Sequence, residues 1–435
     1  MKIIGPARLA MALVWLAVPA IAEELRPIDR LEEIGFAGDR LKRVTEAYQG
    51  YVESGRLPGA VVLIARNDKL AYLHAFGYQD REQQIAMRPD SIFRIASMTK
   101  PIVSVAAMTL AEEGKLDLAA PVSQYLPEFK DLQVGVEQRD AKTGETVLVM
   151  EPQKRPMIVQ DLFRHTAGLV YGQFGDGLVH RAYRAANVSD RNQTLDEMVG
   201  KLAKLPLAHQ PGEVWEYSMA VDVLGRIIEV VSGTTLDRFV EERVTKPLGM
   251  GSTGFYVREA DAARLAQPQN DPATGQRPAL PDVTKKPRLF SGGGGIVSTA
   301  GDYLKFCEML LHRGGWEEAR VLAPSTVSLM TADALPPGIA YPERAKTRIS
   351  DISPMPNVGQ GFGLGFAVRT AEGRNPLPGN VGTYYWTGAW GTTFWVDPQE
   401  KLIGIMMIQV PLTSGSEYRR AMRNLTYQAL LDPAG

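Results

Sequence analysis

The hydrophobic pattern near the N-terminus predicts one helix and one hairpin. Residues 38 to 55 carry apolar side chains at helical spacing, and Gly55 ends the pattern. Residues 60 to 77 form two β-rich runs joined by Asn67 and Asp68, a pair that favours a tight turn. A helix followed by a two-stranded hairpin is therefore expected here.

The C-terminal part of the chain repeats the β pattern. Strands are expected over residues 361 to 370, 384 to 398 and 401 to 410, with a turn at 397 to 399. A helix is expected over roughly 417 to 431. The two ends of the chain thus contribute strands of similar character.

Most of the intervening sequence has helical periodicity, at residues 97 to 114, 157 to 165, 194 to 205, 219 to 231, 235 to 245 and 299 to 312. Strands at both ends with helices between them predict an α/β protein of the α+β type. We expect an antiparallel sheet made by the N- and C-terminal segments and flanked by helices, with an inserted, mainly helical region. The sheet part would cover roughly 35 to 115 and 290 to 435, and the helical part roughly 116 to 289.

Three stretches interrupt this pattern. Residues 141 to 144 lie at the tip of an expected hairpin, while residues 266 to 288 and 335 to 360 are rich in proline and long for structureless loops. Long loops of this kind often border active sites. The two Pro-rich loops are therefore candidates for the wall of a substrate pocket.

The first 22 residues have the features of a secretory signal. Lys2 and Arg8 precede an apolar run from 9 to 19, and a small-x-small triplet ends at Ala22. An uncleaved anchor is the weaker reading, since a span needs ~20 apolar residues. We expect cleavage after Ala22, export to the periplasm or the medium, and no integral membrane association of the mature domain, residues 23 to 435.

The composition narrows the possible functions. The chain has 435 residues, of which 45% are hydrophobic and 22% charged, as in ordinary globular proteins. Lys and Arg number 48 against 49 Asp and Glu, for a net charge of −1, and no basic run with interleaved aromatics occurs. Nucleic acid is therefore not an expected partner.

Cysteine and histidine usage gives no support to a metal or cofactor. Cys307 is the single cysteine and lies in a helical pattern, so it is expected to be a small buried hydrophobe. The five histidines are scattered, without an H-E-x-x-H motif or a Cys/His cluster. We therefore predict that the protein uses neither a metal ion nor an organic cofactor.

Ser97 and Lys100 form a Ser-x-x-Lys motif at the start of a buried helix. Pro101 is acceptable only in a first helical turn, so the helix must begin near Ser97. The two side chains lie about 60° apart around that helix and can share a face. The helix N-terminus favours negative charge at Ser97 and disfavours the ammonium form of Lys100, so the amine can act as a base. The simpler alternative is that Ser97 only caps the helix.

Two later positions strengthen this motif. Tyr217 follows a Pro-Gly turn just before a helix, where a phenol can relay a proton, although a half-buried core role is the common one for tyrosine. Gly388 follows Thr387 on a strand, and the backbone amide of Ala389 can join that of Ser97 as two donors to an oxyanion. A literal Lys-Thr-Gly also occurs at residues 142 to 144. We reject it as the strand motif because it precedes Tyr217 and lies in a charged turn.

In this order, the motifs resemble those of the penicillin-recognising serine enzymes. The sequence is similar to the serine β-lactamase fold in its class C and carboxylesterase branch, and most similar to family VIII carboxylesterases such as the 1,4-butanediol diacrylate esterases. The matching segments are SMTKP, LFRHTAGLVYG, WEYSMAVDVLG, TGFYV, SGGGGIVSTAGDYLKF and WTGAWG. They extend from about residue 57 to 410, nearly the whole mature chain.

The resemblance implies an antiparallel sheet beside a helical region, with the active site between them. It implies that Ser97 is the nucleophile, Lys100 its activating partner, and Tyr217 the general base and acid. The amides of Ser97 and Ala389 would form the oxyanion hole. Together with the strand motif it places six residues near the substrate: Tyr171, Asp222, Trp386, Thr387, Gly388 and Trp390. For Asp222, a buried structural carboxylate is an equal alternative.

Two departures from the class C β-lactamases bear on the substrate. Those enzymes continue the tyrosine motif to an Asn that binds the substrate amide, whereas Ser218 and Met219 follow here. Their strand motif begins with a Lys that pairs with the substrate carboxylate, whereas Trp386 occupies that position here. Losing a charge-assisted contact costs ~1.5 to 3 kcal/mol. The interpretation is a serine carboxylesterase for neutral short-chain or bulky esters.

Two alternatives remain open at this point. A class C-like β-lactamase or D,D-carboxypeptidase with side esterase activity would share the same nucleophile. A non-catalytic binding protein would retain the fold without needing Ser97, Lys100 or Tyr217. A Ser-His-Asp hydrolase has little support because no GxSxG occurs in the chain, and His165 is read as structural.

Overall fold

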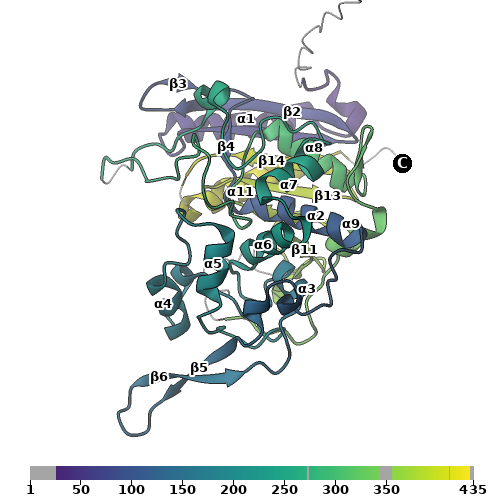
Figure 1. Ribbon diagram of the computed structural model, residues 1–435. Coiled ribbons are helices and arrows are strands. Elements are labelled where there is room, and N and C mark those ends of the chain that lie inside the picture. The colour runs from purple at the N-terminus through teal and green to yellow at the C-terminus, as the bar shows by residue number, and fades with distance from the viewer. Residues whose placement is uncertain (1–25, 272–273, 343–354, 411, 432–435) are drawn as a thin grey trace, which may run out of the picture.

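The computed structural model describes residues 26–271, 274–342, 355–410 and 412–431 (Figure 1). The expected signal, residues 1 to 22, lies outside the described residues. The chain forms a large sheet. Helices from the middle of the chain and one projecting hairpin extend away from this sheet (Figure 1).

The main sheet is antiparallel and has the strand order β10-β11-β12-β13-β14-β1-β2-β3. Its strands are β1 (Gly59–Arg66), β2 (Lys69–Asp80), β3 (Ile85–Ala86), β10 (Gln360–Phe362), β11 (Ala367–Arg369), β12 (Tyr384–Thr387), β13 (Thr393–Asp397) and β14 (Leu402–Met407). All its strands come from the two ends of the described chain, which confirms the predicted fold class.

The helices are α1 (Gly38–Glu53), α2 (Thr99–Glu112), α3 (Val159–Phe163), α4 (Leu178–Ala185), α5 (Leu195–Leu202), α6 (Ala220–Ser232), α7 (Leu236–Val240), α8 (Ala300–Leu311), α9 (Pro324–Met330) and α11 (Leu412–Tyr427). Short two-stranded pairs join β4 (Phe93–Arg94) to β7 (Val297–Ser298), β5 (Gln133–Arg139) to β6 (Thr146–Pro152), and β8 (Gly315–Trp316) to β9 (Ala319–Arg320). The sequence pattern did not predict α4, α9 or the β8–β9 pair.

Strands β1 and β14 join the two ends of the chain. Val61 pairs with Met407 and Arg66 with Leu402, and every residue of both strands is buried. Because side chains alternate between the faces of a strand, both faces of the sheet must be covered. Helix α1 packs on β2 and on α11, and α8 packs on β1 and β14. The predicted hairpin turn is present, with Asn67 and Asp68 in left-handed conformations.

Several predicted boundaries are wrong in detail. The strand expected over 361 to 370 is a hairpin of two short strands, β10 and β11. The chain reverses there because Gly365 has a φ of 100° and a side chain on Gly363 would meet the Met330 carbonyl at 2.1 Å. The strand expected over 384 to 398 is likewise interrupted between β12 and β13. The C-terminal helix begins at Leu412, five residues before its predicted start.

Helix α2 is the centre of the molecule and carries the Ser-x-x-Lys motif at its start. All its residues from Thr99 to Leu110 are buried, and it packs against α6 and α7. A 3₁₀ turn, Ala96–Met98, precedes it, so Ser97 lies just before the α-helix rather than within it. This position leaves the serine at the end of the core and beside open space.

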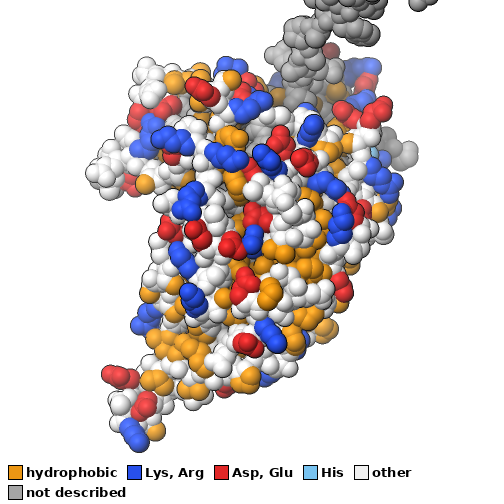
Figure 2. All heavy atoms as spheres, in the orientation of Figure 1, with side chains coloured by type: hydrophobic (Ala, Val, Ile, Leu, Met, Phe, Trp, Pro, Cys, Tyr) orange, Lys and Arg blue, Asp and Glu red, His pale blue; other side chains and the backbone are white. Residues whose placement is uncertain are grey.

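The surface carries charges of both signs. Figure 2 shows basic and acidic side chains interspersed over one face, in keeping with the near-neutral composition. Within the described residues, no helix combines the length and the apolar character needed to cross a bilayer.

Candidate active site

The turn that carries Ser97 is held from several sides. Ala96 has a φ of 45°, a conformation that is unfavourable for alanine and that marks a constrained turn. The carbonyl of Met98 accepts a hydrogen bond from the Tyr303 hydroxyl at 3.0 Å, and the amide of Ile95 donates to the Ile296 carbonyl at 3.1 Å. The surrounding helix and strand therefore position the half-buried Ser97 rigidly.

Lys100 lies directly below the serine. Its side chain is 1% exposed, and its Nζ is 3.4 Å from the Ser97 Oγ, 3.1 Å from the Tyr171 hydroxyl and 2.7 Å from the Gly293 carbonyl. The carbonyl can only accept, so Nζ donates to it. A neutral amine can still donate to Tyr171 and accept from the serine hydroxyl. The geometry is compatible with a proton acceptor for Ser97.

Tyr217 contacts the lysine with the face of its ring. Nζ of Lys100 lies 4.5 Å from the ring centroid, and the buried Tyr217 hydroxyl has no hydrogen-bond partner among the described residues. The phenol that does bond Lys100 is Tyr171, whose pKa is raised well above its usual value, chiefly by burial and then by Asp222. Both phenols line the cavity described below, and the general-base role of Tyr217 stays a prediction.

His165 supports Tyr217 from behind. The two rings meet edge to face with centroids 4.8 Å apart, and the imidazole Nδ1 lies 3.3 Å from the Ser218 hydroxyl. Burial, and to a lesser extent Lys100, lowers the pKa of His165 well below its usual value. His165 is thus a neutral packing residue, consistent with a structural role.

Asp222 acts on the site through the peptide of Gly293. Its Oδ1 accepts from the Ser291 hydroxyl at 2.5 Å and from the Gly293 amide at 3.0 Å. The carbonyl of the same glycine accepts from Lys100. A side chain on Gly293 would meet the Asp222 carboxylate at 2.3 Å and the Tyr171 hydroxyl at 2.8 Å. Only glycine fits between these two groups, and Asp222 thereby helps to position the lysine.

The end of β12 approaches the nucleophile closely. A side chain on Gly388 would meet the Ile95 carbonyl at 2.4 Å, so this glycine permits contact with the serine turn rather than with a ligand. Ala389 and Trp390 line the cavity, and the Ala389 amide donates to no other described residue. That free amide is suited to an oxyanion hole beside Ser97.

Trp386 and Thr387 do not lie where the strand motif suggested. The indole is 1% exposed and packs between Tyr217 and Phe362, with ring centroids 5.4 and 5.3 Å away. Thr387 borders a separate small cavity with Tyr385 and Trp395. Neither is among the residues that line the cavity at Ser97, so direct substrate contact by Trp386 is not supported by its position.

Ser97 opens into a cavity of about 250 Å³. Its walls come from both the sheet part and the helical region, and they include Arg94, Ser97, Tyr171, Phe174, Arg191, Met198, Tyr217, Met219, Asp222, Pro281, Val283, Leu289, Gly293, Ala389 and Trp390. Pro281 and Val283 belong to the first Pro-rich loop, which therefore forms part of the wall. The second Pro-rich loop contributes no described residue to it, and its residues 343 to 354 lie outside the described ranges.

Two arginines on the cavity wall were not predicted from the sequence. Arg94 is nearly buried; its guanidinium donates to the Pro281 and Ala266 carbonyls, and burial lowers its pKa to about 10. Arg191 lies on the loop before α5. No motif marks Arg191, because its place in the cavity depends on how that loop folds. Gly293, by contrast, stands in the SGGGG run, whose unusual glycine content was a visible signal.

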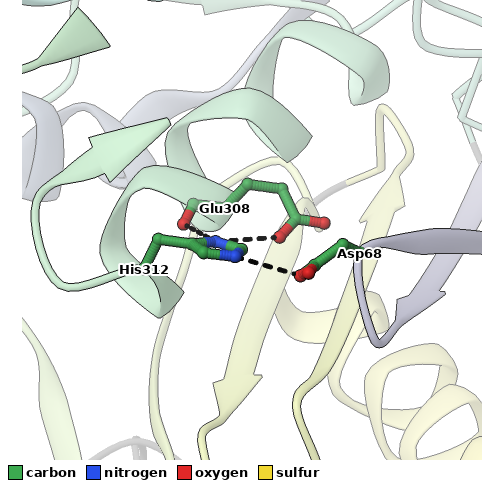
Figure 3. A group of neighbouring side chains, drawn as sticks. All are labelled: Asp68, Glu308 and His312. Atoms are coloured by element: carbon green, nitrogen blue, oxygen red, sulfur yellow. Dashed lines mark hydrogen bonds and ion pairs between the residues drawn. The ribbon is translucent and has the colours of Figure 1, made fainter. Parts of the chain in front are cut away.

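A second polar cluster lies away from the cavity, between the β1–β2 turn and the end of α8 (Figure 3). Asp68, Glu308 and His312 offer ligand atoms within 4.8 Å of one another, and this is the group of described residues that could hold a metal ion. However, both ring nitrogens of His312 already have partners: Nδ1 the Glu308 carbonyl at 3.1 Å, and Nε2 the Asp68 carboxylate at 3.2 Å. We interpret the cluster as an ion-pair network.

The fold and the site together define a class of protein. An antiparallel sheet flanked by helices, with a serine and a lysine one turn apart at the start of the central helix, is the architecture of the serine β-lactamases and penicillin-binding proteins. The chain belongs to the Beta-lactamase family, whose sequence profile matches residues 44–428.

Individual relatives narrow this assignment. Protein Rv1367c of Mycobacterium tuberculosis is 38% identical over 365 residues, which cover 82% of this chain and 87% of the relative. Esterase EstB of Burkholderia gladioli is 33% identical over 379 residues, covering 82% and 86%. The solved structure of EstCE1, a hydrolase with promiscuous acyltransferase activity, has 29% identity and a TM-score of 0.72, covering 89% and 99%. The chain is accordingly a serine ester hydrolase of the β-lactamase fold.

Proposed function

We propose that the protein hydrolyses carboxylic esters through an acyl-enzyme on Ser97. The observation that carries the proposal is the half-buried serine that opens into the cavity, with Lys100 Nζ 3.4 Å from its Oγ. Ser97 Oγ attacks the ester carbonyl as its proton passes to the Lys100 amine, and a carbon–oxygen bond forms. The negative charge moves to the carbonyl oxygen, which accepts hydrogen bonds from the Ala389 and Ser97 amides.

The second half of the cycle returns the enzyme to its starting state. The tetrahedral adduct collapses, and the alcohol leaves with a proton supplied through Tyr217, which the Lys100 amine replenishes. Water then attacks the acyl carbonyl and gives up a proton along the same route. The acid departs and Ser97 is regenerated. Asp222 contributes by holding the Gly293 peptide against Lys100.

The assignment is tested with Ser97→Ala. We expect hydrolysis of p-nitrophenyl butyrate to fall to background, because the nucleophile is lost, while the circular dichroism spectrum and unfolding midpoint stay unchanged. A fluorophosphonate probe should add one mass adduct to the wild type and none to the variant. An unlabelled wild type would favour a non-catalytic binding protein, and an active Ser97→Ala variant would exclude this nucleophile.

The expected preference for neutral esters rested on two missing groups, an Asn amide at Met219 and a Lys cation at Trp386. The structure adds that Trp386 is buried behind Tyr217 and so does not face the cavity itself. The cavity instead presents Arg94 and Arg191. This observation keeps the second candidate, a class C-like β-lactamase or D,D-carboxypeptidase, in consideration, because its substrates carry a carboxylate. Nitrocefin turnover with a kcat/KM above that for p-nitrophenyl butyrate would favour it over the esterase.

We also propose that the protein is exported and that its leader is cleaved after Ala22. The supporting feature is the charged, apolar and small-residue pattern of the first 22 residues. N-terminal sequencing of the protein secreted by an expressing cell should begin at Glu23. A product that starts at Met1 would contradict the proposal.

A further inference from the structure

The charges around the cavity are unevenly matched. Arg94 and Arg191 line it, whereas Asp222 is the carboxylate among its described lining residues. Asp222 is 4% exposed and already accepts hydrogen bonds from Ser291 and Gly293. The cavity therefore has an excess of positive charge that its own acidic group does not neutralise.

The two arginines differ in how they are held. The guanidinium of Arg94 donates to two backbone carbonyls, which fixes it as a support for the Pro-rich loop. Arg191 donates to no described residue and forms no ion pair with one. Its side chain keeps an exposed surface, yet surrounding protein lowers the pKa of its guanidinium. Asp222 attracts Arg191 electrostatically, without a hydrogen bond or ion pair between the two side chains.

A guanidinium left free on a concave wall is suited to one kind of ligand group. Its planar fork of donors matches a carboxylate, and a charge-assisted contact of this type is stronger than a neutral one. Arg94 and Arg191 repel each other electrostatically, so an anion bound at Arg191 would also relieve like-charge repulsion. A neutral ligand would relieve none of it.

We propose that Arg191 is a substrate-binding residue for a carboxylate, and that the protein prefers esters whose acyl or alcohol part carries one. The inference rests on the proposed ester hydrolysis at Ser97. The ester carbonyl would sit at Ser97 and Ala389, and the carboxylate would reach Arg191 across the cavity. The arginine then sets specificity and takes no part in the chemistry.

The experiment compares two p-nitrophenyl esters of similar length, the neutral butyrate and the mono-ester of glutaric acid, which carries a free carboxylate. In the wild type we expect the higher kcat/KM for the glutarate. Arg191→Gln should lower kcat/KM for the glutarate about tenfold, mainly by raising KM, and leave the butyrate within twofold. Arg191→Lys should retain most of the preference. Added salt should weaken it in the wild type.

The matched control is Arg238→Gln, which removes an exposed cation of α7 that does not line the cavity. It should leave both esters unchanged, which separates a local contact from a change in net charge. Equal loss on both esters with Arg191→Gln, or no loss on the glutarate, would overturn the carboxylate role. Failure of the wild type to hydrolyse either ester would instead overturn the proposed esterase activity itself.

Discussion

Lys100 and Glu308 are two ionisable side chains that are almost equally buried, 1% and 2% exposed, yet their surroundings differ. Lys100 at the start of α2 is surrounded by oriented neutral groups: a carbonyl, two hydroxyls and the face of an aromatic ring. Glu308 near the end of α8 has a carboxylate oxygen, Oε2, that no described residue hydrogen-bonds, and His312 Nδ1 lies 3.8 Å from it.

The difference distinguishes a preorganised catalytic site from a buried ionisable side chain that the fold merely accommodates. Around Lys100, each polar group has a defined direction, which fixes the amine beneath Ser97. Around Glu308, no described donor hydrogen-bonds Oε2, and burial together with Asp68 raises the pKa of the carboxyl to about 7. The first arrangement supports chemistry, and the second makes stability depend on pH.

Removing the Lys100 amine should have the largest effect on activity. Lys100→Met keeps the length of the side chain, and we expect kcat/KM for p-nitrophenyl butyrate to fall by about 10³-fold, because Ser97 loses its proton acceptor. The fold should survive, since an apolar side chain of the same length replaces the buried amine. Lys115→Met, at an exposed lysine that pairs with Glu113, is the control and should stay within twofold. Retention of most activity in Lys100→Met would remove the lysine from the mechanism.

The two phenols can be separated by removing one hydroxyl at a time. Tyr217→Phe should lower kcat/KM by about 10²-fold or more, because the proton route to the leaving group is lost. Tyr171→Phe removes one hydrogen bond from Lys100 and should cost about tenfold. Both are measured as kcat/KM on the same ester, with the unfolding midpoint as a check on folding. The reverse order of effects would assign proton transfer to Tyr171, whose hydroxyl is hydrogen-bonded to the Lys100 amine.

Glu308→Gln tests the other side of the comparison. The folded-state pKa of Glu308 is raised from 4.5 to about 7, so the protonated form contributes stability that is complete below pH 4.5 and is lost as pH rises through 7. Glutamine cannot ionise and escapes that loss. In urea unfolding, the variant should gain about 2 to 3 kcal/mol relative to wild type between pH 4.5 and pH 8.

The control for this measurement is Glu318→Gln at an exposed carboxylate, which should not reproduce the stabilisation that Glu308→Gln shows at pH 8. Esterase activity should be unaffected by either variant. If Glu308→Gln differs from wild type equally at both pH values, the carboxyl does not titrate in this range and the contrast with Lys100 disappears.

Neighbouring glycines give the smallest and most local test. Gly293→Ala places a methyl group 2.3 Å from the Asp222 carboxylate, so the peptide that holds Lys100 must shift, and we expect kcat to fall about tenfold with little change in KM. Gly294→Ala meets no atom closer than 3.7 Å and should be nearly silent. Similar losses in both variants would point to general destabilisation of the loop instead of a change at the lysine.

Sequence reasoning anticipated the parts of the site that depend on local spacing. Ser97 and Lys100 lie close together because three residues of helix bring them there, and the strand motif correctly brought Ala389 and Trp390 to the same cavity. Tyr171, Tyr217 and Asp222 were placed by resemblance, and all three line the cavity. The resemblance did not reveal which phenol hydroxyl is hydrogen-bonded to the Lys100 amine.

The position of Trp386 does not support the predicted substrate contact, and the reason is physical. Adjacent residues of a strand point to opposite faces, and sequence spacing does not reveal which face meets a cavity. Here the indole fills the space behind Tyr217, so a position that holds a cation in related enzymes holds a core side chain. The charge of the pocket comes instead from Arg191 on the loop before α5 and Arg94 on β4, which no shared motif connects.

The amino-acid sequence by itself determined most of the elements, the order of the motifs and the class of fold, because helical and strand periodicity and short-range spacing are local properties. Only the tertiary structure decided which side chains line the cavity, that Gly293 links Asp222 to Lys100, and that Arg191 has no hydrogen-bond or ion-pair partner among the described residues. Those facts depend on contacts between segments more than seventy residues apart, and such contacts are set by packing of the whole core.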